Sequence, residues 1–243
     1  MEAKDLPLLV IGAGRGGTSI LAACLDGHPR IVMRSEYRSA GLLMGDSFPI
    51  AATASLIDDR LTAFRAACDD EVLKHPGRVW GNKITTEQIG GLEEHNALND
   101  ARVDVVERFV GAMTGYRIVF ILRHGASCVD SKVRRTGQPP VRAAIKWCYA
   151  ARLFERLRAA RALAFWCRYE NLVSDPKRVL AELCDCLGLP YDAAMLSQTD
   201  NGDLLLPEYR HGRFLAEKAT EIPSLSPELG ALLRPWLERL GYA

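Results

Sequence analysis

The stretch of sequence that decides the fold runs from Leu8 to Glu36 and reads LLVIGAGRGGTSILAACLDGHPRIVMRSE. Its continuously apolar start, Leu8–Gly12, predicts a buried strand that leads directly into a glycine-rich loop. A helix is expected over Thr18–Asp26, ended by Gly27, and a second strand over Ile31–Met33. A glycine loop that opens a helix presents backbone N–H groups and the positive end of the helix dipole. The unit therefore predicts binding of an anionic, nucleotide-like ligand.

The rest of the chain alternates short apolar runs with helical patterns. Further strands are expected at Val79–Lys83, Arg117–Leu122 and Ala164–Tyr169. The expected helices cover residues 51–75, Ala101–Met113, Ala126–Arg135, Val141–Ala160, Asp175–Leu187 and Ser226–Leu240. This alternation predicts an α/β fold of three layers, a central parallel sheet with helices on both faces. No linker or repeat divides residues 1–243, so one domain is expected.

The bulk composition excludes several classes of protein. The formal net charge of the 243 residues is +1, which gives no global field for nucleic acid or acidic membranes. No apolar run reaches membrane-spanning length, and the N-terminus does not resemble a signal peptide, so a cytoplasmic location is expected. The seven cysteines have no regular spacing and the five histidines no ligand spacing. We therefore expect neither disulfides nor a metal.

Three interpretations of the glycine loop compete, and the first two are a dinucleotide-binding loop and the loop of P-loop nucleotide kinases. Gly12, Gly14 and Gly17 satisfy the GxGxxG pattern, and Glu36 lies nineteen residues after Gly17, where a ribose ligand is expected in an NAD(P)-dependent oxidoreductase. The spacing of Gly12 and Gly17 also fits the loop of P-loop nucleotide kinases, but Thr18 stands at the position of their lysine. A purely structural glycine turn capped by Thr18 is a further alternative.

A third interpretation accounts for more of the loop. Arg15 supplies a positive charge, and Thr18 and Ser19 add hydroxyl donors at the first helical turn. A terminal phosphate or phosphosulfate gains directly from such charge-assisted hydrogen bonds, whereas a dinucleotide pyrophosphate is held mainly by backbone N–H groups. The loop therefore favours a terminal anionic group.

Two later segments indicate a second anion-binding place. The strand that ends at Leu122 is followed by Arg123, and the next helix carries Ser131 and Arg135 four residues apart on one face. These residues form either a second anion pocket or a solvated basic helix face. Tyr169, at the end of the last strand, is either a half-buried aromatic residue or a ring close to a nucleotide.

Together these segments resemble the PAPS-dependent sulfotransferases. The loop GAGRGGTS with the following LDGHPRI looks like the 5′-phosphosulfate loop of that family, and RHGASCVDSKVRR looks like its 3′-phosphate motif. The segment RYENLVSDPKRVLAELCDCLGLP resembles the part that precedes the family's C-terminal region. The resemblance implies a P-loop-like α/β fold. It also implies transfer of a sulfuryl group from 3′-phosphoadenosine-5′-phosphosulfate (PAPS) to a hydroxyl acceptor, giving PAP and a sulfate ester.

The resemblance is closest to the branch with a glutamate base, the tyrosylprotein sulfotransferases and their bacterial relatives. It implies that Glu36 is the general base, that Lys83 and Arg15 take part in catalysis, and that Arg38 contacts the acceptor. The residues that it implies for the donor are Gly14, Arg15, Gly16, Gly17, Thr18, Ser19, Arg123, Ser131, Arg135, Tyr169 and Lys218, with Arg213 as a competitor of Lys218.

The acceptor itself is less clearly indicated. Residues 40–79, 84–99 and 196–213 are expected to line its place, and they carry neither an aromatic cluster nor a strongly basic stripe. This composition favours a small molecule or a glycan over a peptide. An oxidoreductase, a P-loop kinase and a non-catalytic nucleotide-binding module remain as alternatives, and the oligomeric state is not indicated.

Overall fold

The computed structural model describes residues 6–45, 54–98, 100, 102–197, 204 and 222–242. Lys218 and Arg213 therefore lie outside the described residues. Five strands form one sheet in the order β2-β3-β1-β4-β5, and every neighbouring pair is parallel. The strands are β1 (Leu8–Gly12), β2 (Ile31–Ser35), β3 (Val79–Lys83), β4 (Arg117–Leu122) and β5 (Leu163–Arg168).

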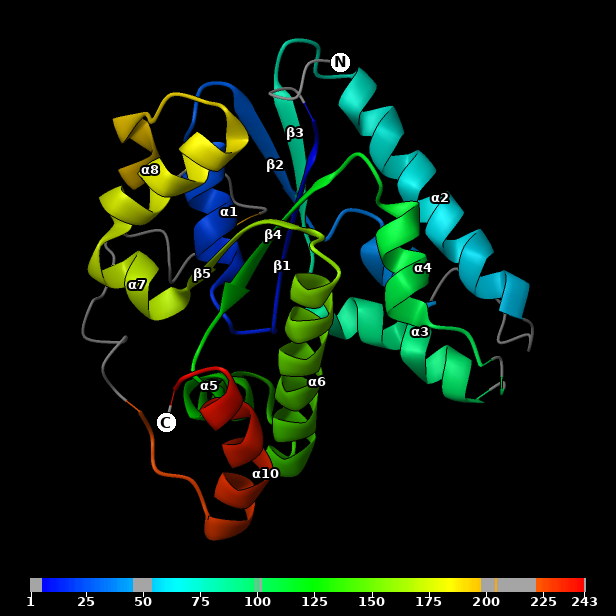
Figure 1. Cartoon of the computed structure of the whole chain (residues 1–243), viewed down its shortest axis with the longest axis vertical. Helices are drawn as coiled ribbons and strands as arrows, with labels where there is room; N and C mark the ends of the chain where they lie inside the picture. Colours follow the sequence, from blue (N-terminus) through cyan, green and yellow to red (C-terminus); the bar gives the residue numbers. More distant parts are fainter. Residues whose placement is uncertain are drawn as a thin grey trace.

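Helices cover both faces of this sheet (Figure 1). One face carries α1 (Thr18–Asp26), α7 (Tyr169–Ser174) and α8 (Pro176–Leu187), with the short 3₁₀ helix η3 (Ala193–Leu196) beside them. The elements on the other side or at its rim are the π-helix η2 (Ala40–Met44), α2 (Ala54–Leu73), α3 (Thr86–Leu98), α4 (Val105–Ala112), α5 (Gly125–Thr136), α6 (Pro140–Ala159) and α10 (Pro227–Arg239).

Strand β1 shows how the sequence produces the two cores. Its side chains alternate between the faces of the sheet, as in any strand. Leu8 and Val10 belong to the core beneath α1 and α8, and Leu9 and Ile11 belong to the core beneath α2, α4 and α6. All four side chains are fully buried, which is why the strand reads as a continuous apolar run. The expected three-layer α/β fold is confirmed.

The strand order separates two of the interpretations of the glycine loop. In the Rossmann order 3-2-1-4-5-6, the strand that carries the ribose ligand lies next to β1. Here β3 lies between β1 and β2, so Glu36 follows a strand that is not adjacent to the loop. The dinucleotide interpretation loses the geometry on which it depended.

The sequence interpretation was wrong about several boundaries. Strand β5 ends at Arg168, and Tyr169 is the first residue of α7 rather than the last residue of a strand. Helix α3 was not predicted, because Gly90 and Gly91 interrupt its pattern and glycine disfavours helix interiors. Gly91 has a packing role, since a Cβ at this position would lie 2.6 Å from the Cα of Met44.

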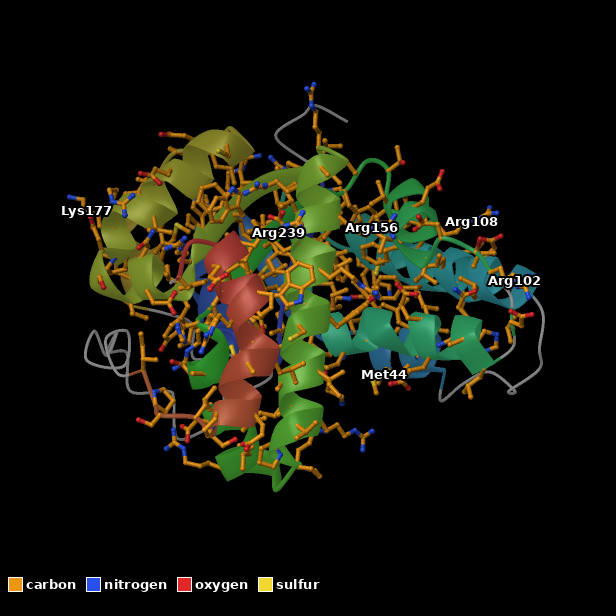
Figure 2. The ribbon with its side chains drawn as sticks, turned by 60° about the horizontal axis from the view of Figure 1, so that its bottom comes forward. Met44, Arg102, Arg108, Arg156, Lys177 and Arg239 are labelled. Atoms are coloured by element: carbon orange, nitrogen blue, oxygen red, sulfur yellow. The ribbon has the colours of Figure 1, made fainter. Side chains whose placement is uncertain are left out.

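Many of the cations of the chain belong to ion pairs on the outer surface. Figure 2 shows α10 lying alongside α6, with Arg239 and Arg156 labelled on these two helices. Arg239 pairs with Glu155 at 3.0 Å, and Arg156 pairs with Asp104. Exposed pairs of this kind contribute little to stability, and they leave a smaller group of cations to consider as ligand contacts.

Candidate active site

The candidate residues stand in a row along one edge of the sheet. Because all five strands are parallel, their carboxyl ends meet at the same edge. In sheet order this edge presents Glu36 after β2, Lys83 at the end of β3, the glycine loop after β1, Arg123 after β4 and Tyr169 after β5. Strands are spaced by about 4.8 Å, so Glu36 and Arg123 start roughly 14 Å apart.

At one end of this row Glu36 and Lys83 form an ion pair. Lys83 Nζ lies 2.7 Å from Glu36 Oε1, and Gln88 Nε2 donates to Glu36 Oε2 at the same distance. The Lys83 side chain is 5% exposed, whereas that of Glu36 is 41% exposed. The carboxylate is therefore oriented by two donors and still open to solvent on the side away from them.

Gln88 was not among the predicted site residues. It lies in the first turn of α3, where its carbonyl oxygen accepts the Thr85 N–H at 2.8 Å, which orients the amide toward Glu36. Since the sequence did not reveal α3, it contained no signal that could place Gln88 beside Glu36.

Residues with a strained backbone lie at the same edge of the sheet as the candidate site residues. In the described part of the chain six residues other than glycine have a positive φ, and three of them are Arg15, Glu36 and Arg38. The left-handed region costs such residues roughly 1 kcal/mol each. At Glu36 the N–H donates to the Lys83 carbonyl oxygen at 2.7 Å, so the ladder of the sheet holds the turn that exposes the side chain.

The glycine loop turns sharply at Gly17. This residue has a φ of +97° and occupies the N-cap position of α1, where no side chain caps the helix. The first turn of α1 begins with the buried Thr18 and the partly buried Ser19 and contains no acidic residue. Its N–H groups are thus directed at the place where an anion is expected.

Replacing Gly17 with alanine is expected to lower the free energy of unfolding by roughly 2–4 kcal/mol. The Cβ would require an unfavourable φ and would lie 2.5 Å from the ring of Tyr169. Chemical denaturation measures the loss. The matched control is Gly137→Ala, where φ is +65° and nothing lies within 4 Å of the new Cβ. If both variants lose the same stability, the close approach of Tyr169 does not constrain the loop.

The two segments that were predicted to bind anions are in direct contact. Arg15 Nε donates to Ser131 Oγ at 3.2 Å, and Arg123 Nη1 donates to the Arg15 carbonyl oxygen at 3.0 Å. The Arg123 guanidinium lies over the ring of Tyr169, 4.3 Å from its centroid. Arg123 Nε is buried and has no acceptor among the residues described, so the guanidinium retains a donor for a ligand.

Two other predicted residues lie at the rim. Arg135 is exposed on α5, one turn beyond Ser131. Arg38 is also exposed, with its guanidinium 5.8 Å from the centroid of the Tyr37 ring. Their roles as donor and acceptor contacts stay predictions.

A buried carboxylate that the sequence analysis did not consider lies against the loop. Both carboxylate oxygens of Glu87 accept the Gly14 N–H, at 3.0 and 3.2 Å, and Glu87 forms an ion pair with Lys132. Burial alone would raise the pKa of the Glu87 carboxyl, but Lys132 and the Gly14 N–H outweigh this effect and hold the pKa below its usual range. Glu87 therefore stays ionised beside the loop.

No group of three metal-ligating side chains comes together in the ranges that the structure describes. Within the same ranges, no helix has the length and apolar character needed to cross a membrane.

The chain is similar in part of its sequence and in its fold to known sulfotransferases. The model of the sulfotransferase family matches residues 111–193, the segment that contains Arg123, Ser131, Arg135 and Tyr169. No curated protein matches the chain significantly. Among solved structures, a sulfotransferase domain from the curacin biosynthetic pathway has a TM-score of 0.69 at 17% identity, covering 98% of this chain and 99% of its own.

Two further solved structures have the same fold. The sulfotransferase domain of the olefin synthase from Synechococcus PCC 7002 has a TM-score of 0.67 at 19% identity, with 98% and 94% of the two chains covered. Sulfotransferase STF9 from Mycobacterium avium has a TM-score of 0.57 at 11% identity, with 97% and 76% covered. The fold is thus the P-loop-like fold of the sulfotransferases. The family match is confined to residues 111–193, and the solved structures show similarity of fold over nearly the whole chain.

Proposed function

We propose that the protein transfers a sulfuryl group from PAPS to a hydroxyl acceptor and releases PAP and a sulfate ester. The observation that carries this proposal is the pair of Glu36 and Lys83, 2.7 Å apart, at the carboxyl ends of β2 and β3. Strand β3 neighbours β1, which leads into the glycine loop, and that loop is linked to Arg123. Such a transfer needs a carboxylate that can take a proton, a buried ammonium and two anion-binding places.

The residues of the row fit a donor with two separated anionic groups. Gly14, Arg15, Gly16, Gly17 and the hydroxyls of Thr18 and Ser19 would surround the 5′ end at the N-terminus of α1. At the 3′ end the unsatisfied Nε of Arg123 would donate to the phosphate, helped by Ser131 and Arg135. Tyr169 would lie against the nucleotide, and Lys218 would add a contact from the C-terminal region.

In the mechanism Glu36 accepts the proton of the acceptor hydroxyl as its oxygen forms a bond to sulfur. The bond between sulfur and the bridging oxygen of the phosphate breaks at the same time, and its electrons stay on the phosphate of PAP. Lys83 and Arg15 stabilise the negative charge that develops on that oxygen, as cations do in phosphoryl transfer. Gln88 holds the carboxylate while the charge of Lys83 is drawn toward the donor.

The acceptor is proposed to be a small molecule or a glycan, bound near Glu36 with Arg38 at its rim. One of the similar folds is the sulfotransferase domain of an olefin synthase, a name that favours a small molecule over a peptide. The use of Glu36 as the base would place the protein in the glutamate-base branch of the family.

The donor can be tested with three ligands and one measurement. PAP is expected to raise the midpoint of thermal unfolding, because a ligand at 100 times its Kd stabilises the folded state by about 2.7 kcal/mol. NADH and ATP are expected to leave the midpoint unchanged. A shift with NADH or ATP and none with PAP would contradict the proposed donor and favour an oxidoreductase or a kinase.

A further inference from the structure

The Glu87 carboxylate and Lys132 connect the two halves of the site. Glu87 lies next to Gln88, which holds the base, and Lys132 lies next to Ser131, which holds Arg15. Both side chains of this pair are only 12% exposed. The pair is therefore enclosed between α3 and α5, directly against the glycine loop.

The loop is shaped around this carboxylate. A Cβ on Gly14 would lie 2.8 Å from Glu87 Oε1 and 3.0 Å from Lys132 Nζ, so a side chain at this position would have to displace these two side-chain ends. The carboxylate accepts a backbone N–H of the loop in the way that an oxygen of a bound phosphate or sulfate does. Glu87 thus acts as an internal anion on a loop that otherwise suits an external one.

The surroundings of the pair are rich in positive charge. Lys146 on α6 is half-buried, and burial together with the nearby Lys132 and Arg142 lowers its pKa, which Glu87 partly offsets. If Glu87 moved away, the Lys132 ammonium would face the loop without that compensating charge. Such a group favours binding of a further anion at the same place.

We propose that the 5′ end of the donor competes with Glu87 for the loop and for Lys132, so that Lys132 becomes a donor-binding residue when Glu87 is displaced. The proposal rests on the proposed function, since it concerns the same donor. Glu87 accepts from Gly14, the residue before Arg15, and a carboxylate that remained there would repel the anionic end of the ligand. When Glu87 is displaced, this repulsion is removed, and the Lys132 ammonium pairs with the anion of the ligand instead of with Glu87.

The test is calorimetric titration of the whole chain with PAP, AMP and adenosine 3′-monophosphate at one fixed salt concentration. Glu87→Gln keeps an oxygen that can accept the Gly14 N–H but removes the charge. We expect it to bind PAP and AMP roughly tenfold more tightly than the wild type, the size of one lost repulsion. Adenosine 3′-monophosphate lacks the 5′ group and is expected to gain less than twofold.

Lys132→Met gives a second, independent variant. It is expected to weaken PAP binding roughly tenfold and to reduce the gain of Glu87→Gln when the two changes are combined. The matched control is Glu93→Gln, which neutralises another ion-paired glutamate of α3, 3.7 Å from Arg152, and is expected to leave PAP affinity unchanged.

The outcomes separate this inference from the proposed function. If the wild type binds PAP and Glu87→Gln binds it no more tightly, the competition is disproved while the donor stands. An equal gain for adenosine 3′-monophosphate would also overturn it, because the effect would be one of net charge. Wild-type affinity in Lys132→Met would remove Lys132 from the site. If neither the wild type nor Glu87→Gln binds PAP, both the donor and the competition are wrong.

Discussion

Glu36→Gln is expected to lower the turnover of PAPS by a factor of roughly 10²–10⁴, the contribution of a positioned general base. The amide has nearly the shape of the carboxylate, and its oxygen can still accept from Lys83, but it cannot take the proton of the acceptor. PAP affinity should change little, because Glu36 follows β2 and the residues proposed to bind the donor lie around β1 and β4. Turnover is measured as PAP released with a hydroxyl acceptor, and affinity by calorimetry.

The control for this variant is Glu182→Gln. Glu182 pairs with Arg178 on α8, on the side of the sheet that carries α1, and its loss should not affect turnover. If Glu36→Gln retains wild-type turnover, Glu36 is not the base. A loss of PAP affinity as large as the loss of turnover would instead show that Glu36 supports the fold of the site.

Arg123→Ala is expected to weaken PAP binding roughly 100-fold and AMP binding less than about threefold. A charge-assisted hydrogen bond contributes about 1.5–3 kcal/mol, and Arg123 has a buried Nε that is free to make one. AMP lacks the 3′-phosphate and does not lose this interaction. Calorimetric titration of both nucleotides gives the ratio of the loss in PAP affinity to the loss in AMP affinity.

Arg134→Ala is the matched control for Arg123→Ala. It removes an exposed arginine of α5 whose partner is Asp130, and it should leave both affinities unchanged. Equal losses of PAP and AMP affinity in Arg123→Ala would place Arg123 in the support of the loop, through its hydrogen bond to the Arg15 carbonyl, and not at the 3′-phosphate.

The strands and the loop could be predicted from the sequence because their signals are local. The apolar run Leu8–Gly12 and the glycines after it give the same strand and turn in the structure. The order of the strands has no local signal. That order decides whether Glu36 follows the strand beside the loop or the one beyond it, and only the structure shows β3 in between.

The side chains around Glu36 also show what local sequence patterns can and cannot predict. Lys83 could be proposed from the resemblance to the sulfotransferases, and the structure puts it 2.7 Å from Glu36. Gln88 and Glu87 could not be proposed, because both lie on α3, a helix that the sequence does not predict since Gly90 and Gly91 interrupt its pattern. The glycine that hides α3 in the sequence is the one that lets it approach η2 closely.

The position of β2 at the margin of the sheet has a consequence for the size of the acceptor. In the described chain no strand lies beyond β2, so the sheet places no wall on the far side of Glu36. A nucleotide held over β1 and β4 would direct its reactive end toward Lys83, and the attacking hydroxyl would arrive from the opposite direction, on the side of Glu36. If the proposed function is right, the sheet itself would limit only the end of the acceptor that carries the hydroxyl, since no described strand would lie beside the remainder.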